Sequence, residues 1–241
     1  MLIDRSKIVG VKAFIQYYFS MEYKREKLLK IARPGPLRDF LAVPFPAIEQ
    51  LLYDTHILSV DFETTGFDAN KDQILSIGFV DLQDGKIPLA TKYHNVINTQ
   101  HELAAENVIV HSITDQHQQQ GIDLAQAVED LLAALAGKVM LVHYAQIERT
   151  FLQKACLQLY GISPVFPMID TLMLAKRRKD KSLVSYDPSQ LRLHHLRKEH
   201  HLPAHFAHHA LNDAVATAEL FLAEVALQAN PKKALLNSYL L

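Results

Sequence analysis

The sequence predicts an α/β fold in which helices cover both faces of a mixed β-sheet. An apolar, β-prone run at residues 56–62 precedes two further runs that an Asp-Gly turn joins, which is typical of an antiparallel hairpin. A short buried run at residues 139–142 then alternates with stretches of helical periodicity, as expected for strands covered by helices. The 241 residues suffice for one large domain, or for one domain with an appendage.

The first 50 residues are predicted to form an extension. Residues 1–32 have the pattern of a basic, partly amphipathic helix, and Arg33-Pro34-Gly35-Pro36 should end it. Two more prolines follow shortly and predict an extended linker, because successive prolines join neither a helix nor a central strand. We therefore divide the chain into a basic helical extension with a Pro-rich linker, residues 1–50, and a domain, residues 51–241.

Within the domain, apolar periodicity and turn residues define the expected elements. Asp84-Gly85 supplies the hairpin turn, and Pro167 precedes a helical stretch. The expected strands are residues 56–62, 73–82, 89–97 and 139–142, and the expected helices are residues 121–136, 146–160, 169–178, 191–200 and 210–228.

Composition narrows the classes of function. The formal net charge is −1, so the chain is not a polycation that coats nucleic acid, and any such contact must be a local patch. Cys156 is the only cysteine, which excludes an internal disulfide and suits a reducing cytoplasm. No apolar run reaches the roughly 18 residues of a membrane span, and the N-terminus lacks a signal-peptide pattern. We therefore expect a cytoplasmic location.

Asp61 and Glu63 stand at the end of the first predicted strand. Their i, i+2 spacing places both carboxylates on one face of that strand, where they repel each other and lose solvation. A divalent cation between them removes both penalties, and Mg²⁺ or Mn²⁺ prefers carboxylate oxygens. A strand end whose acids point into water is the alternative.

Two later segments supply further candidate ligands. Glu148 lies in a predicted first helical turn, where the helix dipole favours a negative charge. Asp213 stands on an otherwise apolar, alanine-rich helix, and His208 precedes it by five residues. A histidine has an unperturbed pKa of about 6.5, which suits deprotonation of a water molecule. Alternatively, Glu148 reflects ordinary first-turn preference, and Asp213 and the histidines are solvated surface residues.

Together these segments resemble the motifs of the DEDDh, or DnaQ-like, 3′–5′ exonucleases, and the chain is similar to the proofreading epsilon subunit of bacterial DNA polymerase III. Residues 61–66, Asp-Phe-Glu-Thr-Thr-Gly, resemble the first motif, and residues 208–213 resemble the third. Residues 110–115 resemble a further family segment. The resemblance covers roughly residues 55–226 and implies a ribonuclease-H-like mixed sheet of five strands.

The second motif departs from the family pattern. The family has His-Asn-Ala-x-Phe-Asp where this chain has residues 143–148, His-Tyr-Ala-Gln-Ile-Glu. Glu148 keeps the charge of the family aspartate but adds a methylene group, which bears on rate and on the choice between Mg²⁺ and Mn²⁺. Tyr144 replaces the family asparagine at a position where the substrate is contacted.

The resemblance implies hydrolysis of phosphodiester bonds from nucleic-acid 3′ ends by two divalent ions, Mg²⁺ or Mn²⁺, with a histidine base. The implied metal ligands are Asp61, Glu63, Glu148 and Asp213, and the implied base is His208. The residues implied to contact the substrate are Thr64, Thr65, Gly66, Phe67, His111 and Tyr144. The expected substrate is a single-stranded 3′ end, with DNA favoured over RNA, in replication or repair.

Two alternatives stay open. A non-catalytic nucleic-acid-binding or scaffolding module, degenerate at its second motif, is the alternative to an active nuclease. The extension, residues 1–50, is expected either to contact a polymerase or another protein, or to pack back on the domain.

Overall fold

The structure is a computed structural model that describes residues 21–98, 119–182 and 184–241. Five strands form one sheet in the order β3-β2-β1-β4-β5. The pairs β1–β2 and β2–β3 are antiparallel, whereas β1–β4 and β4–β5 are parallel. The sheet is therefore mixed, as predicted. The strands are β1 (Ile57–Thr64), β2 (Ile74–Leu82), β3 (Tyr93–Val96), β4 (Val139–Val142) and β5 (Met168–Asp170).

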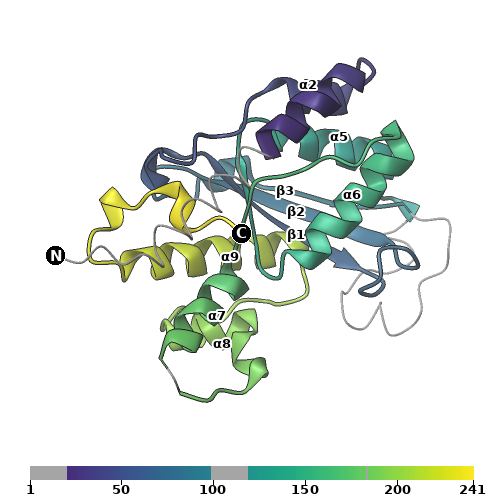
Figure 1. Cartoon of the computed structure of the whole chain (residues 1–241). Helices are drawn as coiled ribbons and strands as arrows, with labels where there is room; N and C mark the ends of the chain where they lie inside the picture. The colour runs from purple at the N-terminus through teal and green to yellow at the C-terminus, as the bar shows by residue number, and fades with distance from the viewer. Residues whose placement is uncertain (1–20, 99–118, 183) are drawn as a thin grey trace.

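Helices lie on both sides of this sheet: α5 and α6 cover one side, and α9 runs along the other (Figure 1). The α-helices with described bounds are α2 (Pro36–Ala42), α5 (Leu124–Leu135), α6 (Gln146–Tyr160), α7 (Thr171–Lys181), α8 (Leu193–Glu199) and α9 (Ala210–Ala226). Short 3₁₀ turns are η1 (Leu52–Asp54), η2 (Leu89–Thr91), η3 (Pro188–Leu191), η4 (Pro231–Lys233) and η5 (Leu236–Ser238). No helix within the described ranges has the length and the apolar character needed to cross a bilayer.

The local sequence accounts for most of these elements. The hairpin turn places Asp84 and Gly85 at φ 52° and φ 67°, the left-handed conformation that a two-residue turn requires. In α5, a stripe at helical spacing is buried against the sheet, consisting of Ala127, Val128, Leu131, Leu132 and Leu135. Buried residues begin β1 without alternation, because helices cover both faces of the sheet there.

Some predicted bounds were wrong. Residues 168–170 form the edge strand β5, and the helix expected from residue 169 begins only at Thr171. The third strand is shorter than expected because η2 occupies its first part. The helix expected over residues 191–200 is α8, which begins two residues later, because Leu191 still belongs to the preceding turn η3.

The described part of the N-terminal extension packs on the domain. Residues 21–31 are helical, and α2 follows where a linker was expected. Leu37, Phe40 and Leu41 of α2 are buried in the same core as the sheet, next to α5. A methionine and two leucines of residues 21–31 also pack against this core. The division of the chain at residue 50 stays a prediction.

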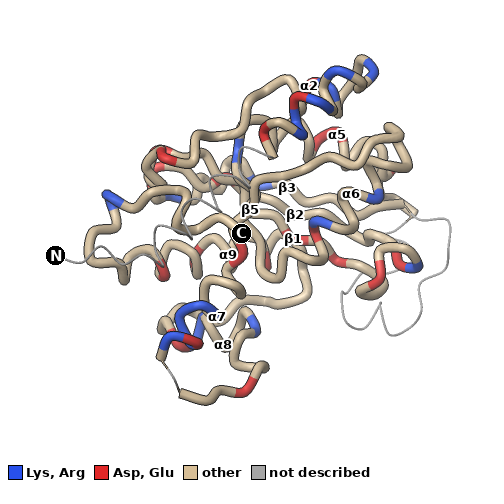
Figure 2. The backbone as a smooth tube through the Cα atoms, viewed as in Figure 1, with Lys and Arg blue, Asp and Glu red and all other residues tan. Residues whose placement is uncertain are grey.

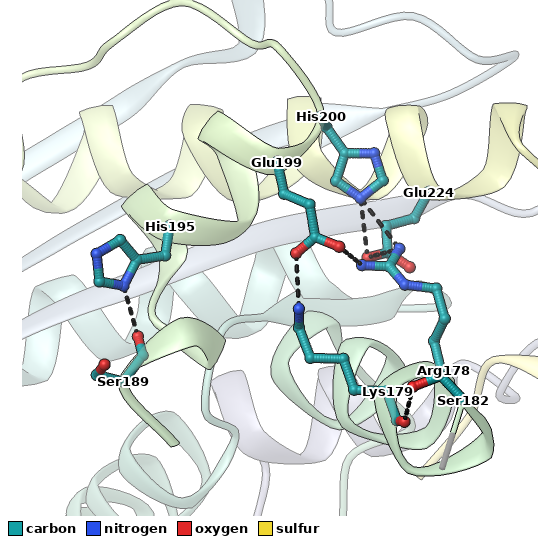
Figure 3. A network of polar contacts seen from close by, with 8 residues as sticks. All are labelled: Arg178, Lys179, Ser182, Ser189, His195, Glu199, His200 and Glu224. Atoms are coloured by element: carbon teal, nitrogen blue, oxygen red, sulfur yellow. Dashed lines mark hydrogen bonds and ion pairs between the residues drawn. The ribbon is translucent and has the colours of Figure 1, made fainter. Parts of the chain in front are cut away.

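A second, smaller core joins α7, α8 and α9 through Ala175, Leu191, Leu196 and Leu220. Figure 2 shows Lys and Arg gathered on α7. Several of these side chains form ion pairs that tie the helices together (Figure 3): Arg178 pairs with Glu224 of α9 and with Glu199 of α8, and Lys179 also pairs with Glu199. These pairs therefore fix α8 against its neighbours.

Candidate active site

Strand β1 holds Asp61 and Glu63 beyond the point where its pairing with β4 ends. The parallel β1–β4 register runs only from Ile57 to Ser59 of β1. On the other side, antiparallel pairing with β2 continues past both acids and aligns Asp61 with Gly78. The two carboxylates therefore stand on a strand that is well fixed by one neighbour and open towards β4.

Helix α9 brings Asp213 to these acids. Ser59 Oγ donates a hydrogen bond to the Ala214 carbonyl, with 2.7 Å between the oxygens, so the start of α9 lies directly on β1. Ligand oxygens of Asp61, Glu63 and Asp213 all lie within 4.8 Å of one another. The structure thus assembles three of the four predicted metal ligands into one group.

Gly78 permits this close approach. A Cβ atom at Gly78 would lie 2.2 Å from the Leu211 nitrogen and 2.3 Å from the Ala210 carbonyl carbon. Because these are backbone atoms of α9, no side-chain rotation could relieve such a contact. A residue without a side chain at this position of β2 is therefore required for α9 to reach the sheet.

Glu148 is adjacent to the group without joining it. It lies in the first turn of α6, is 2% exposed, and its Oε2 has no hydrogen-bond partner within the described part of the chain. Burial is the main reason that its pKa rises to about 8, and backbone hydrogen bonds at Glu148 itself and at Phe62 act in the opposite direction. Its charge in turn raises the pKa of Asp61. Glu148 therefore faces β1 beside the three acids.

The acids of this site resist ionising together. Burial, followed by the charges of Glu148, Asp213 and Glu63, holds the pKa of Asp61 well above its usual value. Burial likewise raises the pKa of Asp213. A divalent cation would remove the mutual repulsion and would supply a partner for the Glu148 Oε2 atom. The donor set, which consists of carboxylate oxygens only, fits Mg²⁺ or Mn²⁺.

The histidine segment before α9 contacts Asp213 at two points. The His208 backbone N–H donates to Asp213 Oδ2 at 2.8 Å, and His208 has φ 65°. His205 Nε2 lies 2.9 Å from Asp213 Oδ1. The ring of His209 stacks on His94 of β3, with 4.1 Å between centroids. The predicted base, His208, is thus an exposed residue next to the acids.

His205 was missed by the sequence analysis. It precedes Asp213 by eight residues across an irregular loop, and no periodicity relates two residues at that spacing. The sequence signal was only the crowding of histidines in this region. The contact exists because the loop turns back onto the first turn of α9.

The turn that carries Tyr144 is held by Asp170. The Asp170 carboxylate accepts from the backbone N–H groups of Tyr144 and Ala145, each at 3.0 Å, and it also caps α7 through Leu172 and Met173. Tyr144 has φ 76° and is 47% exposed. This left-handed conformation suits an asparagine better than a tyrosine. Asp170 thus has a structural role that its position at the end of β5 explains.

His143 is a structural residue in this turn. Thr171 Oγ1 donates to the Val142 carbonyl, so it accepts from His143 Nδ1 at a distance of 2.8 Å. Burial lowers the pKa of His143 to about 4, although the charge of Asp170 acts in the opposite direction. The imidazole is therefore neutral at pH 7 and anchors the end of β4 to α7.

The predicted substrate-contacting residues Thr64 to Phe67 lie at the end of β1 and in the loop that follows it. Thr64 Oγ1 donates to the Gly66 carbonyl at 2.7 Å, and the Asp72 carboxylate accepts from Thr65 Oγ1 and from the Asp68 N–H. These bonds fix the loop, from which Phe67 projects with 84% of its surface exposed. His111 lies outside the described residues.

Comparison with known proteins finds a family and several relatives for this chain. The RNase_T family model, described as "Exonuclease", matches residues 58–221. The DNA polymerase III PolC-type protein of Thermotoga petrophila is 31% identical over 183 residues, which cover 73% of this chain and 13% of that protein. The 3′-5′ exonuclease DinG of Staphylococcus saprophyticus subsp. saprophyticus is 28% identical over 165 residues, 68% of this chain and 17% of that protein. The chain thus spans only a small part of these curated relatives.

Solved structures share the fold. The nuclease domain of 3′hExo, a DEDDh family member bound to rAMP, has a TM-score of 0.60 at 15% identity and covers 76% of this chain and 96% of that chain. A structure of exonuclease I has a TM-score of 0.61 at 14% identity, covering 74% of this chain and 42% of that chain. The ribonuclease-H-like fold predicted from the motifs is therefore confirmed.

Proposed function

This chain belongs to the RNase_T exonuclease family, and from that membership and the geometry of its acids we propose that it is a metal-dependent 3′–5′ exonuclease. The observation that carries the proposal is the group of Asp61, Glu63 and Asp213, whose ligand oxygens lie within 4.8 Å of one another. A buried fourth acid, Glu148, stands beside them. The expected substrate is the 3′ end of a single-stranded nucleic acid, with DNA favoured.

The four acids would hold two divalent ions, Mg²⁺ or Mn²⁺. When bound, these ions supply an activated nucleophile and stabilise the leaving oxygen of an in-line displacement at phosphorus. In the net reaction, water adds to the phosphorus, the bond to the 3′-oxygen of the preceding nucleotide breaks, and a nucleoside 5′-monophosphate leaves a strand shortened by one unit.

The remaining residues bind the substrate and handle the proton. His208 takes the proton from the attacking water, because histidine is the side chain that most often serves as a general base. The loop of Thr64, Thr65 and Gly66 meets the terminal nucleotide. Phe67 stacks against a terminal base, which its exposure permits.

Digestion of 5′-labelled single-stranded DNA and RNA, with Mg²⁺ or Mn²⁺, tests the proposal. The wild-type protein should give a ladder of shortened labelled products, and Asp61→Ala should abolish it. Asp54→Ala is a matched control, because Asp54 is an exposed acid just before β1, at the end of the strand away from the site. Retained binding without cleavage by either metal would refute the proposal and favour the non-catalytic module.

A partner surface in the extension is a second, separate proposal. We propose that the extension, residues 1–50, contacts a polymerase or another protein, because the matched region makes up only 13% and 17% of two named relatives, one of which is a DNA polymerase. Deleting residues 1–20 removes none of the described core residues, so the domain should stay folded. Loss of polymerase co-purification in this variant would support the proposal, and an undisturbed complex would contradict a contact through residues 1–20.

A further inference from the structure

The loop between α8 and α9 is held in place at several points. Arg197 of α8 is 3% exposed, and its guanidinium donates to the carbonyls of Ala216 at 2.7 Å and Pro203 at 2.9 Å. It also pairs with Glu219 of α9 at 2.7 Å. The buried guanidinium of Arg197 on α8 therefore holds the beginning of the loop against α9, because it donates to a backbone carbonyl of the loop and to one of α9 at the same time.

The middle of the same loop is fastened to the first turn of α9. Asn212 Nδ2 donates to the Phe206 carbonyl at 3.3 Å. On either side of Phe206, His205 and the His208 backbone contact the two oxygens of Asp213. The backbone of Phe206 thus has a fixed position next to the metal-binding acids.

The side chain of Phe206, however, has almost no contacts. It is 87% exposed, and Phe67 at 84% is the one comparable phenylalanine among the described residues. A ring held on a fixed backbone next to the acids can stack on a base without first losing conformational freedom. The loop after β1 and the loop before α9 each present such a ring, and each loop adjoins the acids.

Cationic and imidazole groups surround this loop. Burial, and then the charges of His195, Arg192, His205 and His208, lower the pKa of His194. The start of α8 is thus within range of the charges of the two histidines that bracket Phe206. Arg192 and His194 are exposed. An aromatic ring, an exposed arginine and an imidazole N–H donor together have the composition of a site for single-stranded nucleic acid, in which bases stack and phosphates meet cations and hydrogen-bond donors.

We propose that Phe206 stacks on a base of the substrate strand upstream of the scissile bond, and that Arg192 and His194 contact phosphates of the same segment. This inference rests on the proposed exonuclease function and adds a binding surface to it. The acidic centre repels a polyanion, so a neighbouring surface that attracts the strand lets the 3′ end reach the acids.

The test compares KM for a single strand of about twelve nucleotides with KM for a dinucleotide. The wild-type protein should prefer the longer strand. In Phe206→Ala, that preference should fall by about fivefold to 150-fold, the factor that corresponds to a stacking free energy of about 1–3 kcal/mol. Phe206→Tyr should restore the preference, and Arg192→Gln should lower it and weaken its dependence on salt. Leu227→Ala is the control, because Leu227 is 69% exposed at the far end of α9 from Asp213.

Three results would overturn the proposal. One is an unchanged preference in Phe206→Ala, and another is an equal loss in Leu227→Ala. The third is a melting temperature lowered by several degrees in Phe206→Ala, because that would mean that the ring packs within the protein. If the wild-type protein cleaved neither substrate, the proposed function would fail. Fluorescence anisotropy of the labelled strand with the same variants would then decide the stacking proposal on its own.

Discussion

Substituting Gly78 by alanine should move Asp213 of α9 away from Asp61 of β1. The new methyl group would lie 2.2 Å from the Leu211 nitrogen, whereas ordinary contacts begin at 3.4 Å, so α9 must move away from β2 by about 1 Å. Asp213 moves with the helix, while Asp61 stays on β1, directly opposite residue 78. A misplacement of about 1 Å in a catalytic group costs about 100-fold in rate.

Overpacking of this kind also destabilises a protein by about 1–3 kcal/mol, which lowers the melting temperature of a domain of this size by roughly 2–12 °C. The assays are therefore kcat on 5′-labelled single-stranded DNA and thermal unfolding followed by circular dichroism. We expect kcat to fall by about 100-fold at a temperature where the variant is still folded.

Gly161→Ala is the matched control. Gly161 ends α6 with φ 72°, and a Cβ atom there meets nothing within 4 Å. Alanine at this conformation costs roughly 1–2 kcal/mol, so the control loses stability without displacing α9 and should keep its kcat. Wild-type kcat and melting temperature in Gly78→Ala would refute the argument that Gly78 sets the distance between α9 and the sheet.

Three further predictions follow from the site. Asp170→Ala removes the acceptor of four backbone N–H groups and should lower the free energy of unfolding, measured in urea, by about 2–4 kcal/mol. The control Asp187→Ala removes only the cap of η3 and should lower that free energy by about 1 kcal/mol or less. Equal losses in the two variants would contradict the structural role of Asp170. The folded-state pKa of His143 is about 4 and lies below the unfolded value of 6.5, so the unfolded chain binds more protons between these two pH values. Lowering the pH from 7 to 4 should therefore reduce the free energy of unfolding of the wild-type protein by about 1–3 kcal/mol more than that of His143→Gln. Parallel pH profiles of the two proteins would disprove the assignment. Mn²⁺ at 100 times its dissociation constant should stabilise the wild-type protein by about 2.7 kcal/mol, and EDTA should reverse this stabilisation. An equal rise of the melting temperature in Asp61→Asn would mean that the ion binds elsewhere.

Local patterns predicted most of the fold. The strand at residues 139–142 and the helix at residues 146–160 have the predicted bounds, because each has strong apolar patterning and a clear stop. Strand β5 was not recognised, because its three buried residues pass directly into α7, and a short apolar run does not distinguish a strand from a helix. The packing of α2 on α5 was not predicted, because it depends on tertiary contacts, whereas the prolines of residues 33–36 indicated only the end of a helix.

For the candidate site, the spacing of residues in the sequence accounts for the clustering of the acids better than for their surroundings. The spacing of Asp61 and Glu63 on a strand determines that they share a face, and the structure adds Asp213 from α9. The contact of His205 with Asp213 and the clearance above Gly78 depend on how a loop and a helix pack on the sheet. Such contacts join residues with no regular spacing in sequence, so periodicity does not predict them.

The docking of α9 on β1 also has a consequence for biosynthesis. Ser59 and Ala214, which hydrogen-bond there, are 155 residues apart in sequence. Chains fold from the N-terminus as they leave the ribosome, and contacts between distant residues form late. The first acids of the site are therefore made long before Asp213, and a nascent or truncated chain lacks a complete metal-binding group. The proposed nuclease would thus gain its ability to cut nucleic acid only when α9 has docked.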